Sequence, residues 1–139
     1  MDTDIVLVKL DSLQRYVSRV EEKTPSNVEL LKNDYDIQDI ISLNLERAVQ
    51  ISVDIAAHIL SAKDISTPAT MGEAFTALSE VNVISAELAE RLRKAVGFRN
   101  ISVHEYEKID WEIVFSICTK HMKDFREYAA AVLVHYNID

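Results

Sequence analysis

The sequence predicts an all-α protein, an antiparallel helical bundle of four long helices plus a short helix in a single domain spanning residues 1–139. Apolar residues recur at spacings of three and four along most of the chain, as they do on the buried face of a helix. Only two glycines and two prolines occur, which leaves few tight turns. The hydrophobic fraction of 48% is enough for one sizeable core, and these features together favour a bundle.

The first two long helices are predicted in the N-terminal half. One runs over 4–23 and is ended by the turn-forming stretch 24–27. The second starts near residue 26 or 27, has an interruption around 33–34 and ends at 63–68. Its expected buried positions are Ile37, Ile41, Leu45, Ala48, Ile55 and Ile59. It also carries a polar set of Asn44, Arg47, Gln50, Asp54 and His58.

The remaining helices begin at recognisable caps. Thr70 and Glu73 have the spacing of a capping box at the start of the short helix. Ser85 is the expected N-cap of a long helix that runs to Lys108. Asp110 is the expected N-cap of the last helix. The face predicted for that helix comprises Ile113, Ile117, His121, Phe125, Tyr128 and Val132, with His121 interrupting its apolar character.

The charge balance limits the partners. A formal net charge of -8 argues against indiscriminate binding to nucleic acid or to an anionic membrane, and no DNA partner is expected. A local basic cluster nevertheless leaves room for directed contact with a polyanion such as RNA. Its members are Arg91, Arg93, Lys94, Arg99 and Lys108. For the first three of these, a solvated helix face of mixed charge is an equally good interpretation.

Several classes of protein are not expected. The single cysteine, Cys118, cannot form an intrachain disulfide, and its apolar surroundings predict a buried thiol. No uncharged apolar run approaches the ~20 residues of a membrane span, and Asp2 and Asp4 stand where a signal peptide would be positive, so we expect a cytoplasmic protein. The i, i+4 pair of Asp54 and His58 is joined by no further ligands, so we expect no metal site and no cofactor.

The chemistry-bearing residues gather near the end of the long helix that begins at Ser85. Arg99 falls in the middle of an apolar stripe, where a charge needs a partner, a wet cleft or an anion. The stripe comprises Leu88, Leu92, Ala95, Val96, Val103 and Tyr106. Asn100 and His104 are four residues apart and therefore lie one turn above the other on its flank.

An arginine and a histidine in this setting suit the cleavage of an RNA phosphodiester without a metal. The guanidinium matches phosphate oxygens, and imidazole passes protons near neutral pH. Each residue also has a plainer interpretation. A lone histidine is more often a surface or core residue, and Asn100 is equally well a surface amide. An aromatic residue at Tyr106 is usually packing.

The run Arg99-Asn100-x-x-x-His104-x-Tyr106 resembles the R-x-x-x-x-H-x-Y signature of HepT toxins, a branch of the HEPN superfamily, and residues 90–98 resemble its lead-in. The resemblance implies a ribonuclease toxin that cleaves RNA with Arg99 and His104, supported by Asn100, in the shared cleft of a two-fold homodimer. It also implies that a minimal nucleotidyltransferase antitoxin silences the toxin by adding AMP to Tyr106.

A second hypothesis comes from a different class of protein. The chain would then be a non-catalytic helical binding module that partners a nucleotidyltransferase, and the motif would form an interface or a nucleotide pocket. Helical domains of this kind carry either role, so the fold does not choose between them.

Overall fold

The computed structural model describes residues 2–66 and 68–137, and within these ranges the ordered elements are all helical. In chain order they are α1 (Asp2–Lys23), α2 (Val28–Lys32), α3 (Tyr35–Ala62), α4 (Met71–Glu80), α5 (Ala86–His104), a 3₁₀ turn (Tyr106–Lys108), α6 (Trp111–Ser116), a π-helical segment (Ile117–His121) and α7 (Met122–His135).

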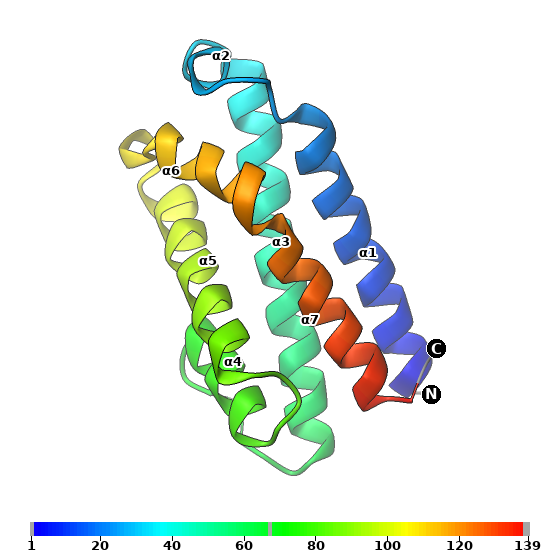
Figure 1. Ribbon diagram of the computed structural model, residues 1–139. Helices are drawn as coiled ribbons and strands as arrows, with labels where there is room; N and C mark the ends of the chain where they lie inside the picture. Colours follow the sequence, from blue (N-terminus) through cyan, green and yellow to red (C-terminus); the bar gives the residue numbers. More distant parts are fainter. Residues whose placement is uncertain (1, 67, 138–139) are drawn as a thin grey trace.

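Helices α1, α3, α5 and α7 alternate in direction and form a closed bundle, in which α3 contacts α1 and α5, and α7 contacts α5 and α1 (Figure 1). The short α4 packs on α3 and α5, and α2 packs on α3 and α6 at the opposite end. The all-α antiparallel bundle expected from the sequence is therefore confirmed.

Local capping explains where the helices begin. The side chain of Asn27 accepts a hydrogen bond from the backbone of Leu30, and that of Asp34 accepts one from Ile37. These two caps separate α2 from α3 at the predicted interruption. The expected caps at Thr70, Ser85 and Asp110 are also present. Each cap satisfies an amide that the first turn of a helix leaves without a partner.

The core lies along the bundle axis. Tyr128 of α7 is fully buried, and its hydroxyl donates a 2.7 Å hydrogen bond to the backbone carbonyl of Ser52 on α3. Its ring meets that of Phe75 from α4 edge-on, with 5.7 Å between ring centroids. Helices α3, α4 and α7 are therefore tied together near the middle of the bundle, and α5 is fixed against this frame by Leu88, Leu92 and Val96.

Helix α5 is shorter than predicted. It ends at His104, and Glu105 leaves the helical conformation with φ −142° and ψ 53°. Tyr106 therefore lies on the following 3₁₀ turn and does not continue the stripe of α5. Val103, which the stripe placed toward the core, is 45% exposed, whereas its neighbour Ser102 is buried. The expectation for Val103 was wrong because a buried polar contact of Ser102, described below, orients the last turn.

The predicted last helix is also interrupted. The π-helical segment between α6 and α7 holds more residues per turn than an α-helix, so the buried face shifts along the sequence. Ile113, which was expected on the buried face, is exposed, and so is His121, which was expected to interrupt that face. The buried positions before α7 are Val114 and Cys118, and the predicted burial of that thiol is confirmed.

Candidate functional site

Arg99 is half-buried on α5, and its side chain extends toward α3. Its Nη2 donates a hydrogen bond to the side-chain oxygen of Gln50, and its Nη1 donates one to the side-chain oxygen of Asn100. The donor–acceptor distance is 3.4 Å in both. These are long bonds, near the limit for a hydrogen bond. The Nε is buried and has no hydrogen-bond partner in the part of the chain that the structure describes. The guanidinium is therefore held in place but retains unused capacity for an acceptor.

A row of polar side chains on α3 lies opposite the motif. Asp39, Ser42, Glu46 and Gln50 follow one another at spacings of three and four, which is one face of a helix. The buried hydroxyl of Ser102 donates a hydrogen bond to the carboxylate of Glu46. This contact fixes the rotation of the last turn of α5, because it turns Ser102 inward and leaves Val103 outside.

The sequence pointed to only part of this row. Gln50 belonged to the polar set expected on this helix, and it also donates a 3.0 Å hydrogen bond to Asp54. Asn44 and Arg47 of the same set lie elsewhere: Asn44 bonds the backbone of Ile40, and the Arg47 guanidinium lies 6.0 Å from the ring centroid of Tyr16. The 3–4–4 spacing of the true row was the one signal that could have identified it.

Tyr106 closes the other end of the row. Its hydroxyl donates a 2.6 Å hydrogen bond to Asp39 and lies 3.5 Å from the hydroxyl of Ser42. Its ring is tilted against that of Trp111, with 6.0 Å between centroids. Burial, and then the hydrogen bond to Asp39, raise the pKa of the Tyr106 phenol above its usual value. The phenol is therefore protonated at neutral pH and turned toward α3.

His104 is exposed at the last position of α5. A separation of five residues places it about 140° around the helix from Arg99. Asn100, also exposed, contacts Arg99 and not His104 among the described hydrogen bonds. One chain therefore presents both groups at the same end of α5 but does not bring them into contact.

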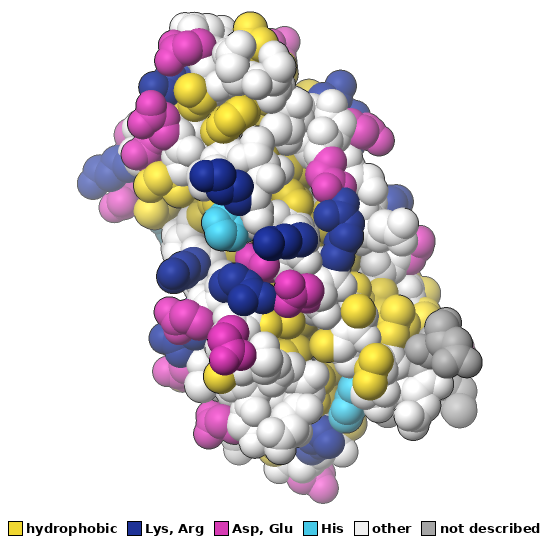
Figure 2. All heavy atoms as spheres, in the orientation of Figure 1, with side chains coloured by type: hydrophobic (Ala, Val, Ile, Leu, Met, Phe, Trp, Pro, Cys, Tyr) yellow, Lys and Arg dark blue, Asp and Glu magenta, His cyan; other side chains and the backbone are white. Residues whose placement is uncertain are grey.

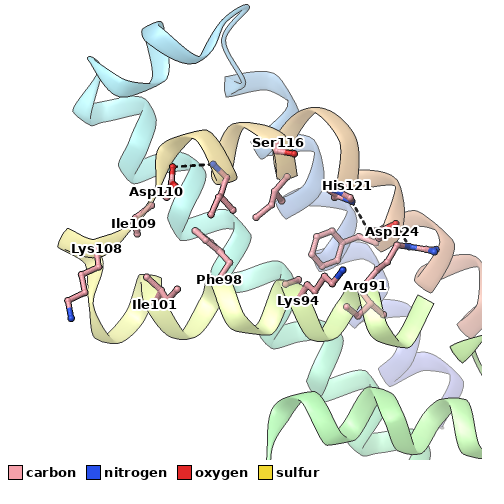
Figure 3. Close-up of a pocket in the computed structure, with 15 residues that line it drawn as sticks. Arg91, Lys94, Phe98, Ile101, Lys108, Ile109, Asp110, Ser116, His121 and Asp124 are labelled. Carbon is pink, nitrogen blue, oxygen red and sulfur yellow. Dashed lines mark hydrogen bonds and ion pairs between the residues drawn. The ribbon is translucent and has the colours of Figure 1, made fainter. Parts of the chain in front are cut away.

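The opposite side of α5 borders a groove of about 550 Å³, closed on its other side by α6, the π-helical segment and α7. Phe98 and Ile101 project from α5 into it (Figure 3). The Arg91 guanidinium at one end bridges Asp124 and Glu127 at 2.9 and 2.7 Å.

Much of the predicted basic cluster is neutralised on this side of the molecule. Arg91 is paired with two carboxylates, and Lys108 lies 3.7 Å from the carboxylate of Glu105. His121 lies 3.5 Å from Asp124. Figure 2 shows basic and acidic side chains interspersed around one histidine in the middle of this face. The cluster is thus a mixed-charge face around the groove, and Arg99 belongs to the other side of α5.

Within residues 2–66 and 68–137, no three histidine, cysteine or acidic side chains are grouped so that they could hold a metal ion. No helix in the described part of the chain is long and apolar enough to cross a membrane.

Comparison with known proteins adds independent information. The model of the ribonuclease HepT-like family matches residues 13–132. An mRNA nuclease HepT of Shewanella oneidensis is 32% identical over 125 residues, covering 90% of this chain and 93% of the relative. A tRNA nuclease HepT of Aphanizomenon flos-aquae is 27% identical over 128 residues, covering 92% of this chain and 87% of the relative.

A solved structure is also similar throughout. It is the tri-AMPylated HEPN toxin of Shewanella oneidensis in complex with the MNT antitoxin, and it superposes with a TM-score of 0.88. The sequence identity is 30%, and the match covers 94% of this chain and 98% of the other.

Proposed function

The chain belongs to the ribonuclease HepT-like family, and from that premise we propose that it is a metal-independent endoribonuclease toxin whose active site is built from Arg99 and His104. The observation that carries the assignment is the state of Arg99. Its Nε is buried without a partner among the described residues, and its two other contacts are long. A permanently charged fork with unused donors is suited to a phosphate group.

The reaction follows from these two groups. The imidazole of His104 takes the proton of a ribose 2′-hydroxyl, whose oxygen attacks the adjacent phosphorus. Arg99 stabilises the negative charge that grows on the non-bridging oxygens. A second acid donates a proton to the leaving 5′-oxygen. The products are a 2′,3′-cyclic phosphate and a 5′-hydroxyl, and no step needs a metal ion.

The second acid comes from a second copy of the chain. In this proposal residues 1–139 form one domain and two such domains pair about a two-fold axis, so that a shared cleft holds two copies of each residue. The position of His104 supports this arrangement, because it is exposed at the end of α5 and has no contact with Arg99 of its own chain among the described hydrogen bonds. Asn100 helps to orient Arg99.

Regulation acts at Tyr106. We assign this residue as the position at which a minimal nucleotidyltransferase antitoxin adds AMP, and the whole system to the cytoplasm. A similar protein is tri-AMPylated in its complex with the MNT antitoxin, which supports AMP addition as the regulatory modification. AMP on Tyr106 adds a bulky anion at the other end of the α3 row from Arg99, where its negative charge and its size hinder the approach of the RNA substrate.

The test uses the purified chain without its partner. Wild type, Arg99→Ala and His104→Ala are incubated with total RNA in EDTA, and product ends are identified by mass spectrometry. We expect cyclic-phosphate ends from the wild type only, with helical content unchanged in both variants. A strict metal requirement, or full activity in either variant, would refute the mechanism.

The same assay addresses the alternative class. If the wild type cleaves no RNA alone or in complex but binds a nucleotidyltransferase through the motif face, the chain is a non-catalytic binding module.

A further inference from the structure

We propose that Asp39 is the proton acceptor for AMP addition at Tyr106, so that this chain supplies part of the chemistry of its own modification. The inference rests on the proposed function, which places the modification at Tyr106. Asp39 lies near the start of α3 and Tyr106 on the turn after α5, so the fold alone brings them together.

The geometry is that of a phenol and its base. The Tyr106 hydroxyl lies 2.6 Å from Asp39 Oδ1, a distance typical of a hydrogen bond from a hydroxyl to a carboxylate. Asp39 is exposed, and Tyr106 is the one side chain among the described residues that donates to its carboxylate. A proton accepted here can therefore pass to water.

The addition of AMP to Tyr106 needs a group that accepts the proton of the phenol. The raised pKa of Tyr106 keeps its phenol protonated at neutral pH, and a protonated phenol is a poor nucleophile. A carboxylate already within hydrogen-bond reach removes the proton as the new bond forms. Ser42, at 3.5 Å, is a neutral hydroxyl whose contact is longer and less suited to this role.

AMP transfer forms one bond and breaks one bond at the α-phosphorus. The proton moves from the Tyr106 oxygen to Asp39 while an oxygen electron pair bonds to the α-phosphorus of ATP, which the nucleotidyltransferase partner binds. The bond from the α-phosphorus to the bridging oxygen breaks, and pyrophosphate leaves. The tyrosine then has no hydroxyl hydrogen, and its new phosphodiester is negatively charged beside a carboxylate. Repulsion moves the modified side chain away from α3.

The test compares two carboxylates on one helix. Asp39→Asn keeps the shape and an accepting oxygen, but an amide cannot take the proton. Asp36→Asn is the matched control, because Asp36 is exposed three residues earlier on α3 and is not among the described partners of Tyr106. Each variant is incubated with the nucleotidyltransferase partner at saturation, ATP and Mg²⁺, and initial rates are followed by intact mass between pH 6.5 and 9.5.

We expect Asp39→Asn to be slower by about 10²-fold at pH 7 and the control to match the wild type. The ratio of wild-type to Asp39→Asn rates should then shrink by about tenfold per pH unit, because hydroxide replaces the missing base. If the hydrogen bond to Asp39 only held Tyr106 in place, the ratio of wild-type to Asp39→Asn rates would not change with pH.

Two outcomes would overturn the role of Asp39 while leaving the proposed function intact. One is a normal rate of AMP addition in Asp39→Asn, and the other is a loss of rate in that variant that is the same at every pH. Tyr106→Phe separates these from a failure of the proposed function. If that variant still gains AMP, the modification lies elsewhere, and both the proposed site and the role of Asp39 fall together.

Discussion

The guanidinium of Arg99 and the side-chain oxygen of Gln50 lie 3.4 Å apart across the boundary between α5 and α3. The partner is a neutral amide, although Glu46 stands one turn earlier on the same helix and is bonded instead to Ser102. Gln50 in turn donates to Asp54. Arg99 is thus positioned by a group that leaves its positive charge uncompensated, as binding of a phosphate requires.

Gln50→Glu should lower RNA cleavage by about tenfold or more. A carboxylate at this position would form an ion pair with Arg99 and compete with the substrate phosphate, and repulsion from Asp54 would push it in that direction. The measurement is kcat/KM on a fluorescent RNA. Gln50→Ala is the control and should change the rate by less than about threefold, because it removes only a long hydrogen bond from the guanidinium to a neutral acceptor. Equal losses in the two variants would contradict this account.

Arg91→Ala should destabilise the fold by about 1–3 kcal/mol. The carboxylate of Asp124 is only 6% exposed and accepts a 2.9 Å bond from Arg91, so the variant leaves a buried charge without its main partner. Urea unfolding followed by circular dichroism measures the change. Arg126→Ala breaks the exposed pair with Glu21 and should cost less than about 1 kcal/mol. If the two variants unfold alike, the network around Asp124 does not stabilise the bundle.

Cys118 should make stability fall at high pH. Burial raises the pKa of its thiol from the ordinary value of 9.0 to about 11. Between these values the unfolded chain loses the proton first, so the contribution is complete below pH 9 and is lost as the pH rises toward 11. Relative to Cys118→Ala, the wild type should lose about 2 kcal/mol between pH 8 and pH 10.5.

Because the chain contains a single cysteine, its ionisation is read from absorbance near 240 nm as the difference between the wild type and Cys118→Ala, which removes the signal of the ionising tyrosines. An absorbance midpoint near pH 9 in the folded protein would show that the thiol is not shielded as the structure describes.

The bundle was predictable from sequence because its determinants are local. The caps at Asn27, Ser85 and Asp110 act within three residues, and the spacing of apolar residues defines each buried face. The end of α5 was not predictable, because Ser102 is oriented by Glu46, which lies 56 residues away in the chain.

The candidate site also has a part that was predictable from the sequence and a part that was not. Arg99, Asn100, His104 and Tyr106 stand in one short motif and were identified from it, and their roles in RNA cleavage and modification stay predictions. The α3 row was missed because a polar row on a helix has the same pattern whether it faces water or another helix. Only the fold shows that Asp39 meets Tyr106 and that Gln50 meets Arg99.

Mixing two inactive variants should restore cleavage if the site is shared between chains. Arg99→Ala homodimers would hold two imidazoles and no guanidinium, and His104→Ala homodimers the reverse, so each should be inactive. A mixed dimer would place the intact Arg99 of one chain in the same cleft as the intact His104 of the other. Cleavage should then exceed either parent, because the mixed dimer combines a guanidinium that binds the phosphate with an imidazole that acts as the base, but it should stay well below the wild type, because the second imidazole that supplies the acid is missing. The variants are co-expressed with different affinity tags and purified through both, and a mixture of separately purified, unexchanged homodimers is the control. If the doubly purified dimer cleaves no faster than that mixture, each chain acts alone and the shared cleft is wrong.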